Sequence, residues 1–335
     1  MTKIIKLHRG LTINLKGVAR KEKTGMKTGS VYALQPDDFE GVKPKVVVKE
    51  GDKVKAGDAL FVNKAYPDVK FASPVSGTVK LIERGERRKV LSVQVEADKE
   101  QQYVDFGKKD ASKLTGAEVK QSLLEAGLFG YINQLPYAIS TNPTTEPKAI
   151  FVSALRDMPL AGDFEYEVQG QEEDFKTGLV ALSKIAKVYV GVGKDSQLVN
   201  VTVNVPVEYV VFSGKCPAGN VGVQVNHIDP VNKGEVVWTV DPTAEMFFGR
   251  LFNTGKVNLI RTLALAGSEV KNPCYFDALV GSRVNLNDNV DVNRNIRIIA
   301  GNPLTGKPQT SAVVGAHQSE ITVIPERDDA DEILG

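Results

Sequence analysis

Residues 149–155, Ala-Ile-Phe-Val-Ser-Ala-Leu, and residues 188–192, Val-Tyr-Val-Gly-Val, are two continuous apolar runs. Runs of this kind are typical of parallel strands that are buried on both faces. Between them, residues 175–187 carry Leu179 and Leu182 at helical spacing. The three segments together predict a right-handed βαβ unit, and therefore an open α/β sheet at the centre of the chain.

Polar side chains follow both predicted strands. Arg156 and Asp157 come directly after the first strand, and Lys194 comes after the second. Ligands of open α/β sheets bind in the crevice at the carboxyl ends of the strands. We therefore expect a binding site here, with Arg156 and Lys194 as hydrogen-bond donors and Asp157 holding Arg156 in place. The alternative is that Arg156 and Asp157 form a purely structural ion pair, since such pairs also gather at strand ends.

Upstream, the pattern G-D-x-V-x-x-G-D-x-L in residues 51–60 is followed by S-P-V-S-G-T-V in residues 73–79. The Gly-Asp dipeptides at 51–52 and 57–58 are typical of hairpin turns. Short strands separated by turns of this kind indicate a compact β structure. The pattern resembles the barrel-sandwich hybrid module of biotinyl and lipoyl carriers. The modifiable lysine of those carriers is missing, because Pro67 stands near its place and Lys64 is off position. Carriage of a covalent cofactor is therefore not expected.

Together with the remaining segments, these patterns predict a mixed fold class that combines α/β and β parts. Thr115 and Glu118 form a candidate capping box for a helix over 116–126. Alternating apolar residues predict strands over 199–212. The sequence predicts three domains: a barrel-sandwich hybrid domain with a basic N-terminal segment over 1–100, a Rossmann-like α/β domain over 101–255, and a β-grasp-like domain of the SLBB type over 256–335. We expect the chain to be truncated after the third domain. Its short strands are expected at 257–264, 296–299 and 321–324.

The charge of the chain is balanced overall but not locally. With 42 Lys and Arg against 41 Asp and Glu, the net charge of +1 argues against nucleic acid as a partner. Residues 1–27, however, carry eight bases and a single acid. We predict that this stretch docks on a partner, the alternative being an ordinary solvated surface. The candidate docking residues are Lys3, Lys6, Arg9 and Lys16.

Several classes of site and targeting signal are not expected from the composition. Two cysteines, Cys216 and Cys274, are too few for an iron–sulfur cluster held by this chain alone. The three histidines lie in separate segments, so no metal site and no catalytic constellation is expected. No signal peptide and no apolar run of about 18 residues is present, so we expect a soluble or peripheral protein.

A series of runs, taken in order along the whole chain, resembles the A subunit of the Na⁺-translocating NADH:quinone reductase. That family also resembles the C subunit of the Rnf complex and the flavin-binding subunit of respiratory complex I. One family loop, G-P-H-P-A-G, here reads Gly-Lys-Cys-Pro-Ala-Gly over 214–219, so roles of the family's histidines are not carried over. The runs are 147–154, 158–161, 217–219, 229–231, 249–252, 254–255 and 264–273.

The resemblance implies a peripheral protein at the cytoplasmic face of the bacterial inner membrane. Its partners would be the other subunits of a six-subunit pump that couples NADH oxidation and quinone reduction to Na⁺ export. Flavins and an iron–sulfur centre would belong to those partners, and the isolated chain would bind no cofactor and have no activity of its own. Quinone is the implied ligand, and Arg156, Asp157 and Lys194 are then the candidate quinone-binding residues.

The alternative function is a self-contained NADH/flavin dehydrogenase related to the flavin-binding subunit of complex I. Flavin-binding relatives carry a glycine-rich run that lets bare backbone approach the flavin. The corresponding run here, residues 127–136, keeps only Gly127 and Gly130, with Tyr131 and Asn133 in the approach path. The sequence therefore favours the pump subunit.

Overall fold

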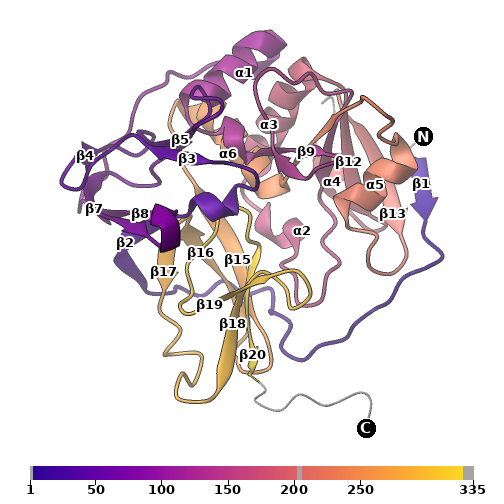
Figure 1. Cartoon of the computed structure of the whole chain (residues 1–335). Coiled ribbons are helices and arrows are strands. Elements are labelled where there is room, and N and C mark those ends of the chain that lie inside the picture. Colours follow the sequence, from indigo (N-terminus) through magenta and orange to yellow (C-terminus); the bar gives the residue numbers. More distant parts are fainter. Residues whose placement is uncertain (1–2, 202–205, 327–335) are drawn as a thin grey trace.

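The computed structural model describes residues 3–201 and 206–326 (Figure 1). Its centre is the predicted βαβ unit: strand β11 (Ile150–Ser153), helix α3 (Glu172–Ile185) and strand β12 (Val188–Gly193). The two strands pair in parallel, with Ile150 opposite Val188. The prediction of a βαβ unit is confirmed, although α3 begins one turn earlier than expected, with three acidic residues in its first turn. Negative charge there complements the helix dipole.

The central sheet has seven strands in the order β1-β13-β12-β11-β14-β9-β10. From β11 the chain adds β12 and β13 on one side and then returns to place β14 on the other side. The point where the direction reverses therefore lies between β11 and β14, whereas the binding crevice expected from the sequence lay at the carboxyl ends of β11 and β12. The further strands are β1 (Lys3–Lys6), β9 (Ile132–Leu135), β10 (Ile139–Ser140), β13 (Glu208–Ser213) and β14 (Val237–Val240).

Helices cover both faces of this sheet, and the side chains of β11 alternate between them. Ile150 and Val152 join the core formed with α3 and α6, whereas Phe151 packs with the residues of α5. This alternation follows from the two-residue period of a strand. The capping box of Thr115 and Glu118 is confirmed at the start of α1. The helices are α1 (Gly116–Glu125), α2 (Phe164–Glu167), α5 (Val221–Ile228) and α6 (Pro242–Thr254).

The prediction of strands over 199–212 is wrong in its first part. Residues Leu198–Val201 form a short helix, α4, and only Glu208–Ser213 is a strand. The local reason is a cap: Ser196 Oγ accepts a hydrogen bond from the Leu198 N–H at 3.2 Å. Such a cap favours a helical turn over an extended chain. Residues 202–205 lie outside the described residues.

The N-terminal part is a barrel-sandwich hybrid, as predicted, built from two small antiparallel sheets. One sheet has the order β17-β2-β8-β7-β4 and the other β3-β5-β6. Phe61 and Phe71 are cross-strand partners on β5 and β6 of the second sheet, and their rings stack with centroids 4.7 Å apart. The strands are β2 (Thr28–Leu34), β3 (Pro44–Val46), β4 (Lys53–Val54), β5 (Ala59–Asn63), β6 (Lys70–Ala72), β7 (Gly77–Arg84) and β8 (Val90–Ala97).

The C-terminal part forms a five-stranded mixed sheet in the order β16-β15-β20-β18-β19. Its strand β17 leaves this sheet and pairs with β2 of the barrel sandwich. Figure 1 shows it below the other two parts, in orange and yellow. Its strands are β15 (Ile260–Ala266), β16 (Cys274–Leu279), β17 (Ser282–Val284), β18 (Ile296–Ala300), β19 (Lys307–Gln309) and β20 (Glu320–Pro325). The short 3-10 helices of the chain are η1 (Pro36–Asp38), η2 (Glu86–Arg88), η3 (Ala111–Lys113) and η4 (Phe129–Tyr131).

Candidate functional site

A cavity of about 330 Å³ lies at the point where the strand order reverses. Most of its walls come from four stretches of the chain that are distant in sequence. The loop after β11 supplies residues 155–158, the end of β14 and the start of α6 supply residues 239–242, the start of α5 supplies residues 219–221, and the C-terminal part supplies His317, Ser319 and Glu320. This is the position at which open α/β sheets bind their ligands.

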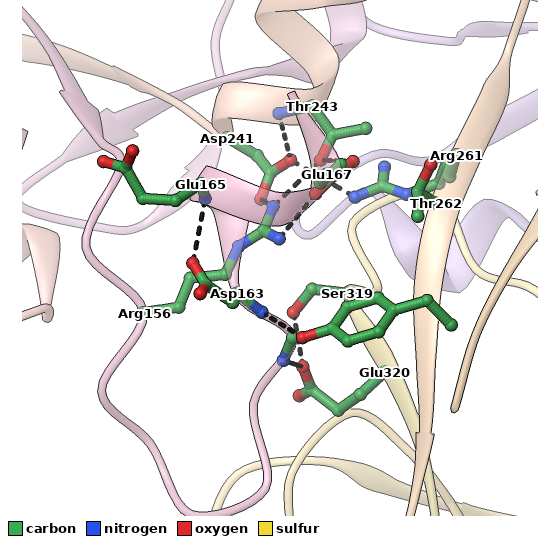
Figure 2. Close-up of polar contacts among 12 residues, drawn as sticks. Arg156, Asp163, Glu165, Glu167, Asp241, Thr243, Arg261, Thr262, Ser319 and Glu320 are labelled. Atoms are coloured by element: carbon green, nitrogen blue, oxygen red, sulfur yellow. Dashed lines mark hydrogen bonds and ion pairs between the residues drawn. The ribbon is translucent and has the colours of Figure 1, made fainter. Parts of the chain in front are cut away.

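Arg156 lines this cavity, but its guanidinium is bound to other protein groups. Its Nη1 donates to Glu167 Oε2 at 2.6 Å, and its Nη2 donates to Thr243 Oγ1 at 2.9 Å (Figure 2). Burial lowers the pKa of Arg156, but the charges of Glu167 and Asp241 outweigh it and raise that pKa above its usual value. The expected ion pair with Asp157 is therefore replaced by one with Glu167, which comes from α2.

Asp241 connects the α/β sheet to the C-terminal part. Its Oδ1 accepts hydrogen bonds from the Thr243 and Ala244 N–H groups, which makes it the N-cap of α6. The same oxygen lies 3.2 Å from Nη2 of Arg261, a buried residue of β15. Burial raises the pKa of Asp241, but the charges of Arg261 and Arg156 lower it overall. The sequence does carry a signal for the cap, Asp followed by Pro, whereas nothing in it marks the buried arginine.

Asp157 lies in the wall of the cavity, beside the thiol of Cys216. Both carboxyl oxygens are buried, and neither has a hydrogen-bond partner among the residues that the structure describes. Gly219 is required beside it, because a Cβ at that position would lie 2.7 Å from Asp157 Oδ1 and 2.4 Å from the Leu155 carbonyl oxygen. The thiol of Cys216 is a near neighbour: burial raises its pKa, and the charge of Asp157 raises it further.

His317, from the C-terminal part, is among the residues that line the same cavity. Its ring lies 5.7 Å from that of Phe39 and 5.6 Å from that of Tyr131, centroid to centroid. Burial lowers the pKa of His317 to about 4, aided by the charges of Arg261 and Lys307 and opposed by Asp241. Its Nε2 has no hydrogen-bond partner in the described part of the chain. Sequence reasoning missed this residue, because it is far from the α/β strands in sequence and no motif surrounds it.

Comparison with known proteins accounts for nearly the whole chain. Residues 5–98 match the NqrA N-terminal barrel-sandwich hybrid domain, residues 114–257 the NqrA second alpha/beta domain, and residues 262–311 the NqrA C-terminal domain. The A subunit of the Na⁺-translocating NADH-quinone reductase of Neisseria meningitidis serogroup B is 33% identical over 332 residues, which cover 96% of this chain and 74% of that protein. The A subunits of the Pseudomonas aeruginosa and Yersinia pestis reductases are 31% and 32% identical, with coverage of 97% and 96% of this chain and 74% of each relative.

The chain belongs to the NqrA family, the A subunits of Na⁺-translocating NADH-quinone reductases. The resemblance inferred from the sequence is thereby confirmed at the level of this family. None of the described helices of this family member is both long and apolar enough to cross a membrane.

Lys194 is not brought to the cavity of this NqrA-family chain. It is exposed and is absent from the residues that line the cavity. Because the strand order reverses between β11 and β14, the end of β12 lies one strand away from the cavity. Of the three candidate quinone residues, Arg156 and Asp157 therefore line it, and Asp241, which follows β14, occupies the position that the sequence suggested for Lys194.

The four candidate docking residues lie on β1 and the arm that follows it. Strand β1 pairs in parallel with β13, which makes it an edge strand of the central sheet. Ile5 packs against the core, whereas Lys3, Lys6, Arg9 and Lys16 are exposed. The arm also exposes apolar side chains, with Leu11 64% and Val18 63% exposed. A strip of bases and apolar groups therefore faces solvent.

The glycines of the run that corresponds to a flavin loop have a packing role. A Cβ on Gly127 would lie 2.8 Å from the Ala72 nitrogen, and one on Gly130 would lie 2.3 Å from the ring of Phe71. Both glycines therefore let this segment pack tightly on β6. No group of three or more candidate metal-binding side chains is found in residues 3–201 and 206–326.

Proposed function

We propose that this chain acts as the peripheral A subunit of a Na⁺-translocating NADH:quinone reductase, on the cytoplasmic face of the bacterial inner membrane. The observation that carries the proposal is the continuous match to NqrA proteins over 96% of the chain. Those relatives are subunits of a larger reductase, so the partners of this chain are the other subunits of the complex. The exposed basic and apolar strip over β1 and the arm offers a surface for such an assembly.

We further propose that the chain binds no flavin, nicotinamide or metal, and that these centres belong to its partners. Two features support this. The residual glycines of the flavin-type run are used for packing on β6. Carrier modules place a modifiable lysine at the hairpin tip between β5 and β6. In this chain Lys64 of that tip is off position and is followed by Ala65 and Tyr66, so a covalently attached cofactor is not expected there.

The chain's own ligand in this proposal is the quinone head group, bound at the cavity between β11 and β14. The cavity has the size of a small-molecule site and combines apolar residues with a few buried polar side chains. Arg156 does not bind the head group in this proposal, because its hydrogen-bond donors are taken by Glu167 and Thr243. It acts instead as a positioning residue for the wall of the cavity.

The proposal is tested by affinity purification of the tagged chain from native membranes. We expect the remaining subunits of the reductase to co-purify, with Na⁺-stimulated NADH:quinone activity in the eluted complex. The same chain purified alone should lack that activity and show no flavin absorption band. A stoichiometric flavin band in the isolated chain, together with NADH oxidation and without partner subunits, would instead establish a self-contained dehydrogenase.

A further inference from the structure

We propose that the cavity binds its ligand through three uncharged hydrogen-bond donors, the side chains of Asn133, Thr239 and Asn220, and that it takes a neutral carbonyl compound and rejects phosphorylated nucleotides. The inference rests on the proposed function, because it takes the head group of a quinone as the ligand. It goes further by naming the contact residues and the class of ligand that the wall excludes.

Two of these donors are neighbours in the central sheet. Asn133 of β9 and Thr239 of β14 lie directly opposite each other in the antiparallel register, and Thr239 in turn lies opposite Phe151 of β11. Residues that are directly opposite in a sheet have their side chains on the same face. Phe151 packs with the residues of α5, so Asn133 and Thr239 lie on the face of the sheet that α5 covers.

The third donor comes from the start of the helix that covers this face. Asn220 is the N-cap of α5, and its Oδ1 accepts from the Gly222 and Val223 N–H groups at 2.9 and 3.2 Å. Because the cap uses the oxygen, the amide NH₂ group is the part of this side chain that is left for a ligand. Asn220 lines the cavity together with Asn133 and Thr239, so a ligand there lies between donors of the sheet and a donor of the helix.

The donors of these three side chains are not used by the protein. The Asn133 side chain, the Thr239 hydroxyl group and the Asn220 NH₂ group make no hydrogen bond within residues 3–201 and 206–326. Thr239 is nevertheless only 8% exposed, and the cavity is where it remains accessible. A donor that has lost bulk water without gaining a partner is costly, and a ligand that accepts a hydrogen bond removes that cost.

The charged side chains of the wall oppose an anionic ligand. Asp157, Asp241 and Glu320 are carboxyl groups, and Arg156 is the one cation among the described residues that line the cavity. The charge of Arg156 is already balanced by Glu167, at 2.6 Å. A phosphate group would therefore meet like charges with no free counter-charge, which is unfavourable in a partly buried site.

A quinone head group suits this combination of donors and charges. It is uncharged and has two carbonyl oxygens on opposite sides of its ring, and each oxygen only accepts hydrogen bonds. One oxygen can accept from Asn133 and Thr239 on the sheet, and the other from Asn220 at the start of α5. The same wall offers nothing to the phosphate groups of NADH or of a flavin nucleotide.

The test measures binding of decylubiquinone to the purified full chain by equilibrium dialysis. Thr239→Val keeps the shape of the side chain but removes its donor, so we expect the affinity to fall about tenfold. Thr239→Ser keeps the hydroxyl group and should stay within about twofold of the wild type. Thr239→Val should not lower the thermal unfolding temperature, because the hydroxyl group has no partner in the described chain. The control Thr78→Val, on β7 of the barrel sandwich, should leave the affinity unchanged.

Two further variants and a competition experiment complete the test. Asn220→Asp keeps a good N-cap for α5 but loses the amide donor, and Asn133→Leu loses its donor with little change in size. Each should weaken binding of decylubiquinone about fivefold or more. NADH and FMN, added in large excess, should not displace decylubiquinone from the wild-type chain.

The outcomes separate this inference from the proposed function. If decylubiquinone binds and none of the donor substitutions changes its affinity, the inference is wrong while a quinone site remains. Equal losses in Thr239→Val and Thr239→Ser would overturn the donor role, and displacement by NADH or FMN would overturn the exclusion of phosphorylated ligands. If the chain does not bind decylubiquinone, the inference and the proposed quinone site both fail. A variant that does not unfold cooperatively is set aside, and the remaining donor variants then decide.

Discussion

Arg156 shows how burial decides the role of a charged residue at the end of a strand. Its partner Glu167 is 1% exposed, and Thr243 donates to the other carboxyl oxygen of Glu167 at 2.6 Å. The cluster consists of Arg156, Glu167, Asp241 and Arg261. Each of these charges lies next to a charge of opposite sign, which is the condition under which buried charges are tolerated. The alternative interpretation of Arg156, a structural ion pair, therefore fits its geometry, with Glu167 as its partner in place of Asp157.

We predict that Glu167→Gln lowers the free energy of unfolding by about 3–5 kcal/mol, because it leaves the buried guanidinium of Arg156 without its counter-charge. Urea denaturation of the two proteins measures the difference. Glu173→Gln is the matched control: its side chain is 85% exposed, so the loss of its charge should change stability by less than about 1 kcal/mol. Equal effects of the two substitutions on the free energy of unfolding would contradict the role of Glu167 as the counter-charge of Arg156.

Glu245 is a buried carboxyl group that should make stability depend on pH. It lies on α6 with no exposure, and neither oxygen has a partner in the described chain. Burial raises its pKa well above the usual value, and the charge of Asp174 adds to this, opposed by Arg250. The folded state thus keeps the proton that the unfolded state releases near pH 4.5. Stability from this group is complete below that pH and is lost as pH rises toward the folded pKa.

We predict that Glu245→Gln has little effect at pH 4 and stabilises the protein increasingly as pH rises, by about 1–3 kcal/mol at pH 8. The neutral amide has the shape of the carboxyl group but no charge to desolvate. Thermal unfolding at several pH values measures this, with the exposed Glu40→Gln as control. A constant difference across the pH range would show that Glu245 does not titrate between the two states.

At the scale of elements, helices α3 and α6 approach so closely that each needs a glycine. A Cβ on Gly249 of α6 would lie 1.8 Å from the Asp174 carbonyl oxygen, and one on Gly178 of α3 would lie 2.4 Å from the Glu245 carbonyl oxygen. Glycine inside a helix is less stable than alanine by roughly 1 kcal/mol. Close packing of the two helices is the physical reason for its presence at both positions.

Gly249→Ala should therefore destabilise the protein by about 1–3 kcal/mol, against the trend of helix propensity, because the two helices must move apart. Chemical denaturation of the variant gives this value. Gly25→Ala is the control, since a Cβ there meets nothing within 4 Å. A gain in stability at Gly249, as propensity alone predicts, would mean that the helices can separate without loss of packing.

At the scale of the whole molecule, the N-terminal arm ties the three parts together (Figure 1). Its strand β1 belongs to the central sheet, the Gly17 carbonyl oxygen accepts from the Gly267 N–H at 2.9 Å in the C-terminal part, and β2 then enters the barrel sandwich. Because backbone hydrogen bonds hold the arm, its exposed basic side chains are available for contacts with a partner.

We predict that reversing Lys3, Lys6, Arg9 and Lys16 to Glu reduces assembly with the membrane subunits at low salt. The loss should become smaller as salt rises, because exposed charges are screened. Co-purification at several salt concentrations measures it. The control reverses four exposed lysines of the barrel sandwich, Lys45, Lys49, Lys55 and Lys64, with the same change in net charge. If both variants assemble equally well, the arm is an ordinary solvated surface.

Local features could be predicted because they depend on residues close together in sequence. The βαβ unit, the Thr115 capping box and the turns at Asp52 and Asp58 follow from periodicity and from short-range hydrogen bonds. Asp52 Oδ2, for example, accepts from the Lys49 N–H at 2.7 Å, an interaction within a single turn. The family resemblance was also readable, since it rests on runs of residues in order.

By itself, the sequence determined that the chain combines a barrel sandwich with a parallel α/β sheet, and that a site should lie where that sheet's strands end. Only the tertiary structure decided which strands meet there. It brought Asp241 rather than Lys194 to the cavity, paired Arg156 with Glu167, and placed His317 in the same cavity as Asp157. The reason is physical: strand order and the packing of the C-terminal part depend on contacts between residues that are far apart in sequence, about which a local pattern carries no information. One such contact is the hydrogen bond from the Gly162 N–H to Glu320 Oε2 at 2.9 Å.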